Sequence, residues 1–303
     1  MKVSLIATVK DAGPAIHEFL ASLDAQTRPP DEIVVVDGGS TDGTLEALRS
    51  ADGITVISEP GANIGRGRNV AVRAATHDVL AVTDADCRLA PDWLERIVRP
   101  LEGGADVVAG AYRPVARSVW QAAAAAHIPE PEELRPGWLP SSRSLAFRRE
   151  AFDAAGGYPE WLEIGEDMYL NHRWLELDVR MELAPGAVAH WRVRPTLAAT
   201  WRQYARYAEG DALAGMYTGR HLLRFATYLG ALLTVESRRG WLLVVAGAAG
   251  VAYTARPVAR TLRRLPEGSA ERAKAMAAVP AMMAFIDGAK MWGYLRGLAR
   301  RKR

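Results

Sequence analysis

The sequence predicts an α/β protein built on a mostly parallel β-sheet with helices on both faces. Over about the first 110 residues, apolar runs that end at polar turns alternate four times with amphipathic segments, which is the pattern of buried strands joined by helices. The chain has 303 residues, of which 49% are hydrophobic and 24% are charged, so it can bury a core. Its one cysteine, Cys87, excludes an internal disulfide and a cysteine-based zinc cluster.

The strands predicted in the first part of the chain are short apolar runs. They lie at Val3–Val9, Glu32–Asp37, Ile54–Ile57, Val79–Thr83 and Asp106–Tyr112. Amphipathic segments between them predict helices that open at Pro14, near Thr44, at Asn69–Thr76 and at Pro91. Strands that alternate with helices through short loops form parallel sheets, so we expect this part of the chain to be parallel.

Residues 115–220 follow a less regular pattern. We expect a strand at Ser144–Phe147, a helix at Arg149–Ala155 and another helix at Asp167–Leu177. A further strand should end at His190 after a turn at Pro185–Gly186. Aromatic residues at near-helical spacing in Thr196–Tyr217 predict a helix that packs on a core.

The region 221–303 is basic and apolar, unlike the acidic residues 1–220 that precede it. Residues 256–303 carry a net charge of +9, whereas residues 1–220 sum to −8. Three uncharged stretches, Phe225–Val235, Trp241–Ala255 and Ala275–Ile286, are each shorter than the roughly 18–20 residues that cross a bilayer. We therefore expect a catalytic domain at 1–220 and a helical region at 221–303 that rests on a membrane surface.

Two details bear on this membrane prediction. Asp287 and Lys290 are three residues apart on one predicted helix face, where they could pair, and this argues against a clean span through Ala275–Leu295. The apolar run at the N-terminus is too short for a signal peptide, so we expect the chain to stay on the cytoplasmic side. A soluble helical appendage is the alternative, and binding of nucleic acid is not expected, because the basic region lacks a recognisable binding motif.

Acidic residues stand where two of the predicted strands end. Asp37 closes a strand in VVVDGGSTDGT, and Asp84 and Asp86 close another in LAVTDADC. Ligands of open α/β sheets bind at the carboxyl ends of strands. Two carboxylates two residues apart offer oxygen ligands to Mg²⁺ or Mn²⁺, although a solvated acidic turn has the same pattern.

The order of these motifs resembles glycosyltransferase family 2, whose members have the GT-A fold. The quoted segments are SLIATVKDAGPAIHEFLASLDAQTRPPDEIVVVDGGSTDGTLEAL and GRGRNVAVRAATHDVLAVTDADCRLAPDWLERIV, and Gly165–Glu166–Asp167 resembles the E-D motif of the family. The resemblance covers residues 2–210 and implies a metal-dependent transfer from a nucleotide-diphosphate sugar, with UDP-sugars favoured, GDP-mannose as the alternative and Mn²⁺ or Mg²⁺ as cofactor. The acceptor implied is lipid-linked, a polysaccharide or otherwise membrane-borne.

The resemblance also assigns roles by position. Thr8 and Asp37 fall where the family holds the nucleotide base, although many relatives have two consecutive acids where this chain has Asp37 and a glycine. Arg68 falls near the base or phosphate, and Asp84 faces the ribose or the metal. The remaining roles are Asp86 and His190 as metal ligands, Asp167 as catalytic base, and Trp161 and Glu166 in the acceptor pocket.

These residue types suit an inverting transfer, in which one displacement occurs at an oxocarbenium-like centre. A general base takes the proton of the acceptor hydroxyl, and a divalent cation offsets the charge of the departing diphosphate. Asp167 begins a predicted helix, whose dipole favours an ionised carboxylate there. The ordinary alternatives are a helix cap for Asp167 and a packed core residue for His190.

Three other functions share parts of the pattern. A phosphatase of the haloacid-dehalogenase type also has D-x-D after a strand, but it has Thr or Val where this chain has Arg88. A nucleotidyltransferase needs a glycine-rich basic loop after the first strand, where VKDAGPA offers only Lys10. A non-catalytic membrane-surface scaffold is the third alternative, and retention of all the acidic motif residues argues against it.

Overall fold

The computed structural model describes residues 1–237, 239–265 and 270–301. The chain divides into two compact units, each described here by itself. One comprises Met1–Arg113 and Glu130–Arg192, and the other comprises Pro114–Pro129 and Val193–Arg303. Residues 114–129 and the helix after residue 193, which the sequence analysis grouped with the catalytic domain, thus belong to the second unit.

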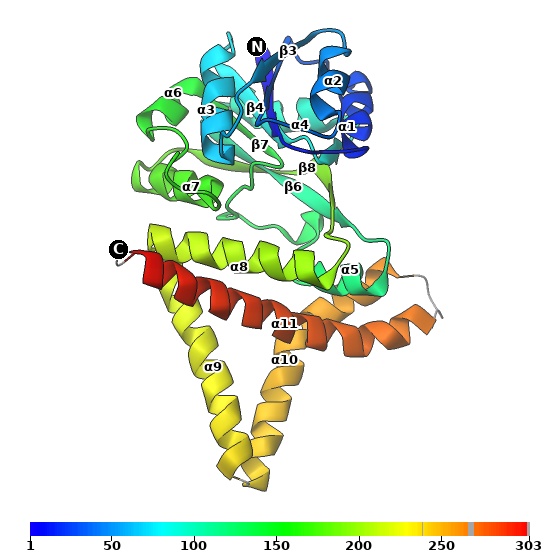
Figure 1. The fold of residues 1–303 in the computed structure, drawn as a ribbon, viewed down its shortest axis with the longest axis vertical. Helices are drawn as coiled ribbons and strands as arrows, with labels where there is room; N and C mark the ends of the chain where they lie inside the picture. Colours follow the sequence, from blue (N-terminus) through cyan, green and yellow to red (C-terminus); the bar gives the residue numbers. More distant parts are fainter. Residues whose placement is uncertain (238, 266–269, 302–303) are drawn as a thin grey trace. The chain divides into compact units, whose positions relative to one another are not determined.

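The first unit is organised around one mixed sheet of eight strands in the order β3-β2-β1-β4-β7-β6-β8-β5 (Figure 1). The strands are β1 (Val3–Val9), β2 (Glu32–Asp37), β3 (Ile54–Ser58), β4 (Val79–Asp84), β5 (Cys87–Leu89), β6 (Val107–Val115), β7 (Leu145–Arg148) and β8 (Met181–Arg192). Strands β1 to β4 pair in parallel, as predicted. Strand β7 runs antiparallel to both β4 and β6, and β5 runs antiparallel to β8.

Helices flank this sheet and supply part of its core. They are α1 (Ala15–Asp24), α2 (Thr44–Arg49), α3 (Ile64–Ala74), α4 (Trp93–Glu102), η1 (Pro131–Glu133), α6 (Arg149–Ala154) and α7 (Glu166–Glu176). Val72 of α3 and Trp174 of α7 join Val34, Leu80 and Phe147 of the strands in one buried cluster. The apolar face of each helix therefore fixes its place against the sheet.

Two local predictions differ from the structure. Helix α3 begins at Ile64, five residues earlier than predicted, because the Asn63 side chain accepts a hydrogen bond from the backbone N–H of Arg66 and caps the helix. The turn predicted at Pro185–Gly186 is wrong, since β8 continues through it. Pro185 is exposed, and a Cβ on Gly186 would lie 2.6 Å from the guanidinium of Arg96, so glycine permits this close approach.

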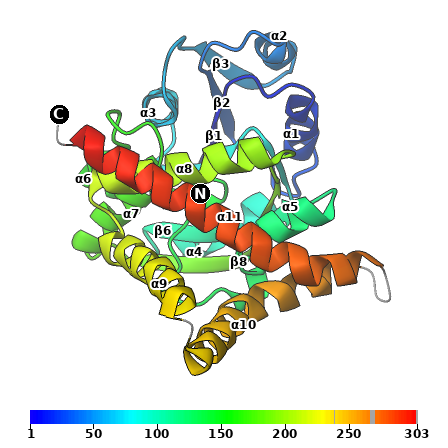
Figure 2. The same ribbon diagram turned by 60° about the horizontal axis from the view of Figure 1, so that its bottom comes forward.

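The second unit is helical and consists of α5 (Val119–Ala124), α8 (Leu197–Ala214), α9 (Thr218–Ser237), α10 (Gly240–Arg264) and α11 (Ala270–Arg301). Helices α8 and α11 pack along each other (Figures 1 and 2). A Cβ on Gly293 would lie 1.9 Å from the carbonyl oxygen of Ala205, and one on Gly297 would lie 2.6 Å from Cβ of Ala212. Small residues therefore bring the two backbones together.

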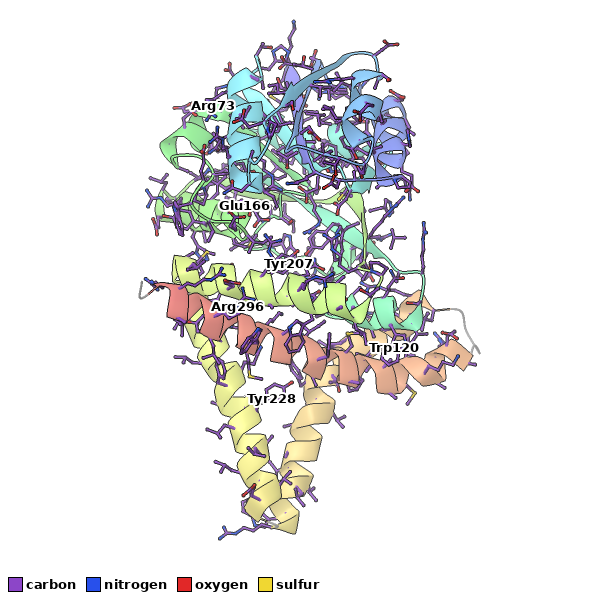
Figure 3. The ribbon with its side chains drawn as sticks, viewed as in Figure 1. Arg73, Trp120, Glu166, Tyr207, Tyr228 and Arg296 are labelled. Carbon is purple, nitrogen blue, oxygen red and sulfur yellow. The ribbon has the colours of Figure 1, made fainter. Side chains whose placement is uncertain are left out.

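Helices α9 and α10 form a hairpin that buries almost nothing. The buried residues are His221 in α9 and Pro257 and Thr261 in α10. The two helices meet near residues 237 and 240 and diverge toward their other ends, with side chains standing out from both (Figures 1 and 3). The large exposed apolar residues are Leu222, Leu223, Leu229, Leu232, Leu233 and Val235 of α9, and Trp241, Leu243, Val244, Val245, Val251 and Tyr253 of α10.

The three apolar stretches of the C-terminal region thus have different environments. Within the described residues, α10 is long and apolar enough to cross a membrane, with a window of mean hydropathy 1.5 that is 6% buried. The stretch Ala275–Ile286 lies in α11, where Ala278, Val279, Met282 and Ile286 are buried in the helical unit. One face of this stretch packs inward, while the Met276 side chain on the same helix is 62% exposed, so its contact with a membrane stays a prediction.

The sequence suggested an ion pair between Asp287 and Lys290. In the structure Asp287 instead links the α9–α10 hairpin to α11. It accepts hydrogen bonds from Arg224 Nε at 2.7 Å, Tyr228 Oη at 3.1 Å and Tyr253 Oη at 3.0 Å. Lys290 lies instead with its ammonium 5.2 Å from the centroid of the Tyr204 ring. Asp287 is 4% exposed, so its charge needs these partners.

Candidate active site

The acidic motif residues gather at the carboxyl ends of the parallel strands. In the strand register Thr8 lies beside Asp84, and Val9 lies beside Asp37. A Cβ on Gly67 would lie 3.0 Å from the Thr8 methyl, so glycine lets α3 approach the end of β1. Arg68 follows Gly67, and α3 therefore delivers its side chain to Asp84 at this edge of the sheet.

Arg68 is the centre of a buried charge network. Its Nη2 donates to Asp84 Oδ1 at 2.6 Å, and its Nη1 donates to Glu166 Oε1. The guanidinium carbon lies 5.3 Å from the centroid of the Tyr158 ring. Arg68 is 3% exposed and Glu166 is 4% exposed. The ion pairs with Asp84 and Glu166 raise the pKa of Arg68, so it stays charged although burial opposes this.

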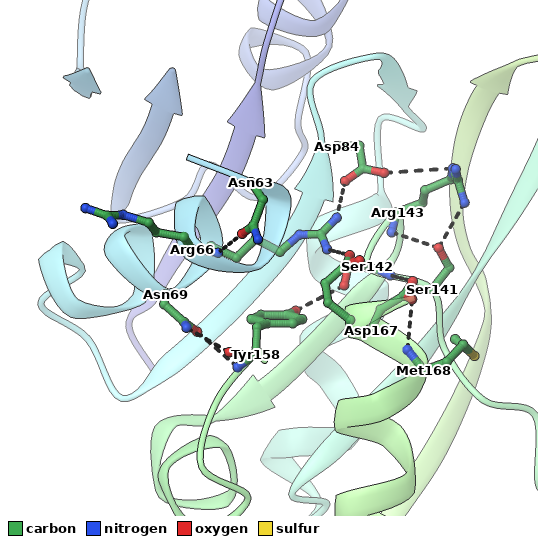
Figure 4. A network of polar contacts seen from close by, with 12 residues as sticks. Asn63, Arg66, Asn69, Asp84, Ser141, Ser142, Arg143, Tyr158, Asp167 and Met168 are labelled. Atoms are coloured by element: carbon green, nitrogen blue, oxygen red, sulfur yellow. Dashed lines mark hydrogen bonds and ion pairs between the residues drawn. The ribbon is translucent and has the colours of Figure 1, made fainter. Parts of the chain in front are cut away.

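Glu166 and Asp167 begin α7 but differ in environment. Burial raises the pKa of Glu166 to about 7, a rise that Arg68 opposes and Asp167 reinforces. Asp167 is partly exposed and accepts hydrogen bonds from the backbone N–H of Met168 at 2.8 Å and of Ser142 at 3.4 Å (Figure 4). Position Gly165 has a φ of 88°, which favours glycine and sets the start of α7.

The segment that enters β7 contributes a second arginine that the sequence analysis missed. Arg143 Nε lies 3.9 Å from Asp84 Oδ2, and its Nη1 donates to Ser141 Oγ at 3.0 Å (Figure 4). Its guanidinium carbon lies 5.5 Å from the Tyr112 ring centroid and 4.8 Å from that of Trp191. Asp84 thus lies between two arginines, and no local motif signalled the second one.

The D-x-D motif offers two carboxylates rather than a complete metal cage. Among the described residues, no group of three or more His, Cys, Asp or Glu is placed to hold a metal. A site with two carboxylates still fits Mg²⁺ or Mn²⁺ chemically, because these ions commonly combine one or two carboxylates with substrate phosphate oxygens. Burial raises the pKa of the Cys87 thiol, and the negative charges of Asp86 and Asp84 raise it further, whereas Arg143 lowers it. These three charged side chains therefore act on the same sulfur.

His190 lies on β8, where it pairs with Arg88 of β5 in the register. Burial, Arg88 and Arg113 all lower its pKa, so its imidazole is held in the neutral form that a metal requires. The same arginines add positive charge around it. Its role as a metal ligand stays a prediction.

Asp37, predicted to contact the nucleotide base, ends β2 and is held by backbone N–H groups. Its Oδ2 accepts hydrogen bonds from the backbone N–H groups of Gly39 at 2.9 Å and Ser40 at 3.0 Å. Asp37 is fully buried, and in the described part of the chain its Oδ1 has no hydrogen-bond partner. A buried carboxylate oxygen without a hydrogen-bond donor costs folding free energy, and an N–H group of a bound ligand would supply that donor.

The two residues predicted for the acceptor pocket lie in contrasting places. Trp161 is 59% exposed and packs edge-to-face on Tyr169 of α7. Glu166 is buried and held by Arg68. Tyr158 is also buried, where its Oη hydrogen-bonds Ser142 Oγ at 3.0 Å. Trp161 therefore has a surface open to an acceptor, whereas Glu166 acts within the charge network.

Comparison with known proteins gives this site its family. The sequence profile of Glycosyl transferase family 2 matches residues 4–156, which is half of the chain. The chain belongs to this family. It is a glycosyltransferase, as the sequence resemblance implied, and the phosphatase, nucleotidyltransferase and scaffold alternatives are set aside.

Several named relatives cover the same region. The glycosyltransferase AglE of Haloferax volcanii is 25% identical over 205 residues, covering 64% of this chain and 67% of that protein. The succinoglycan biosynthesis protein ExoA of Rhizobium meliloti is 30% identical over 198 residues, 59% of each chain. The N-acetylglucosaminyl-diphospho-decaprenol L-rhamnosyltransferase of Mycobacterium tuberculosis is 27% identical over 225 residues, covering 58% of this chain and 72% of that one.

The likeness to a solved structure extends over the whole chain. The mannosyltransferase PcManGT from Pyrobaculum calidifontis, in complex with GDP-Man and Mn²⁺, superposes with a TM-score of 0.58 at 25% sequence identity. The match covers 99% of this chain and 86% of that one. The GT-A fold predicted for this glycosyltransferase is confirmed.

Proposed function

We propose that this enzyme performs an inverting transfer from a nucleotide-diphosphate sugar to an acceptor hydroxyl, with Asp167 as the general base. The Arg68 network carries this proposal. Arg68 joins Asp84 of the D-x-D motif to Glu166, the neighbour of Asp167 in α7. One buried side chain thus links the carboxylate for the leaving diphosphate to the start of the helix that bears the base.

The chain's own residues divide the work of the reaction. Asp167 takes the proton of the acceptor hydroxyl, and the N–H groups of Met168 and Ser142 orient its carboxylate. Glu166, whose pKa is about 7, receives no proton from the acceptor, because Arg68 occupies it. Asp84 and Asp86 would hold Mn²⁺ or Mg²⁺, which offsets the charge of the departing diphosphate. The Mn²⁺ in the PcManGT complex supports this cofactor.

Asp37 and Thr8 are the proposed contacts of the nucleobase. The buried Asp37 Oδ1 is suited to accept a base N–H, which both uracil and guanine offer. The sequence resemblance favours UDP-sugars, while the GDP-Man complex of PcManGT supports a guanosine donor. Thermal-shift measurements with UDP, GDP and dTDP, each with Mn²⁺, decide among them, because a ligand of the folded state raises the melting temperature. Stabilisation by none of the three would contradict the proposal.

We further propose that the α9–α10 hairpin inserts into a lipid bilayer at the cytoplasmic face, where the acceptor is membrane-borne. Its exposed leucines and valines belong to helices with almost no buried residues. The 25 residues of α10 extend about 37 Å, more than the ~30 Å hydrocarbon core. The names of two relatives, a decaprenol-linked rhamnosyltransferase and a succinoglycan protein, support lipid-linked or polysaccharide acceptors.

The membrane proposal is tested by substitutions that leave the helical core alone. Leu229→Gln, Leu233→Gln and Val244→Gln together remove apolar surface from side chains that are 57%, 59% and 72% exposed. This variant should leave the membrane fraction in a high-salt wash, while the wild type stays. The control, Met276→Gln on α11, has a side chain 62% exposed and should behave as wild type. Wild-type protein found wholly in the soluble fraction would contradict the proposal.

A further inference from the structure

The side chain of Arg143 is held between two aromatic rings in the active site. Tyr112 lies on β6 and Trp191 on β8, and the guanidinium carbon is 5.5 Å and 4.8 Å from their ring centroids. The side chain is 16% exposed. Stacking over rings orients the guanidinium plane and leaves its N–H groups pointing sideways, where they can bind an anion.

The guanidinium of Arg143 lies beside the first aspartate of the D-x-D motif. Arg143 Nε is 3.9 Å from Asp84 Oδ2, whereas Arg68 makes its close contact with the other oxygen of the same carboxylate (Figure 4). The next residue toward the N-terminus, Ser142, donates its backbone N–H to Asp167. Arg143 therefore lies beside the carboxylate for the diphosphate and on the segment that touches the proposed base.

The sheet register fixes this position. Trp191 pairs with Cys87 in the antiparallel β5–β8 ladder, and Cys87 directly follows Asp86. The ring that supports Arg143 is thus in register with the end of the D-x-D motif. A side chain that packs only for stability would not need to place its guanidinium beside Asp84 of the motif, and this suggests a ligand.

We propose that Arg143 binds the diphosphate of the nucleotide donor, exchanging its contact with Asp84 for phosphate oxygens. The inference rests on the proposed function and adds a residue to it. The site carries four acidic groups, namely Asp84, Asp86, Glu166 and Asp167. Arg68 already serves Glu166 and Asp84 through both of its terminal nitrogens.

The chemistry favours an arginine for this task. A planar guanidinium presents parallel N–H groups that match two phosphate oxygens, and it stays charged at every working pH. Asp84 and Asp86 would hold the divalent cation, and Arg143 would contact the phosphate oxygens in place of Asp84. The ring stack supports the guanidinium in either contact.

The test compares ligands with and without phosphate on the full-length protein in detergent. Calorimetry with Mn²⁺ measures whichever of UDP, GDP and dTDP the wild type binds, and ligand-observed NMR measures the matching nucleoside. Arg143→Gln should weaken the nucleoside diphosphate about ten- to a hundredfold, the range of a charged hydrogen bond. The nucleoside should bind within about threefold of wild type, and Arg143→Lys should fall between the two proteins. The control Arg173→Gln, on the outer face of α7, should match wild type.

Each other result counts against a specific claim. Unchanged affinity of Arg143→Gln for the nucleoside diphosphate would overturn the inference while leaving the proposed function in place. Equal weakening of the nucleoside and the diphosphate, together with a lower melting temperature, would show a structural role and overturn it as well. If the wild type binds none of UDP, GDP and dTDP, the proposed function fails and the inference fails with it.

Discussion

Substitution of Arg68 should destabilise the protein far more than substitution of Arg66, two residues earlier in the same helix. Both arginines pair with glutamates, but their surroundings differ. The side chains of Arg68 and Glu166 are 3% and 5% exposed, whereas those of Arg66 and Glu59 are 54% and 29% exposed. The two positions therefore form a matched pair in which burial is the main variable.

The magnitudes follow from the cost of a buried unpaired charge. Arg68→Ala removes the arginine that Glu166 and Asp84 share, and breaking a buried ion pair such as Arg68–Glu166 costs about 3–5 kcal/mol. Arg66→Ala breaks an exposed pair, for which the loss is about 0.2–1 kcal/mol. The double variant Arg68→Met/Glu166→Gln should recover part of the loss, because the amide removes one uncompensated charge.

Denaturant unfolding of the full-length protein in detergent measures these differences. Tryptophan fluorescence reports the sheet unit through Trp93 and Trp174, both of which are fully buried. Equal losses for Arg68→Ala and Arg66→Ala would refute the reasoning. If Arg68→Ala fails to fold, Arg68→Lys should still show an intermediate loss, because an ammonium keeps the charge but serves fewer partners.

Three further predictions concern the metal, pH and the hairpin. Asp86→Ala should abolish Mn²⁺-dependent nucleotide binding by calorimetry, and unchanged affinity would end its assignment as a ligand. The pKa of Glu166 is about 7 in the folded protein, above its ordinary value of 4.5, so the unfolded chain loses this proton at lower pH. The free energy of unfolding should therefore fall as pH rises from about 5 to about 7. Glu166→Gln should remove this pH dependence of the free energy of unfolding, measured by denaturant titrations. An unaltered pH dependence would mean that another group causes it. Asp287→Ala should speed amide hydrogen exchange in α9 and α10 while leaving β1–β4 unchanged, and uniform exchange would refute its role in holding the hairpin.

The parallel half of the sheet was predictable because its strands are continuous apolar runs with turn residues at both ends. The antiparallel half was not, since a short run such as Leu145–Arg148 carries no signal of its direction. Asp84 and Glu166 could be selected from motifs. Their connection through Arg68 could not, because Arg68 and Glu166 are 98 positions apart in the sequence. The Arg143 stack depends on side chains from two other strands, and only the folded register brings them together.

The C-terminal region shows a similar limit. Composition identified apolar stretches but did not distinguish a buried one from an exposed one. Gly293 and Gly297 were a signal for close helix packing of α11, whose residues Ala278, Val279, Met282 and Ile286 are buried in the helical unit. Helix α10 lacks such packing over most of its length and keeps its apolar side chains exposed.

The central claim is that Asp167 is the base of a glycosyl transfer, and Asp167→Asn tests it most directly. The amide preserves the size of the side chain but does not accept a proton at neutral pH. Donor affinity should stay close to wild type while turnover, measured as release of the nucleoside diphosphate, falls by roughly 10²–10⁴-fold. Turnover within about threefold of wild type in a folded variant would contradict the claim.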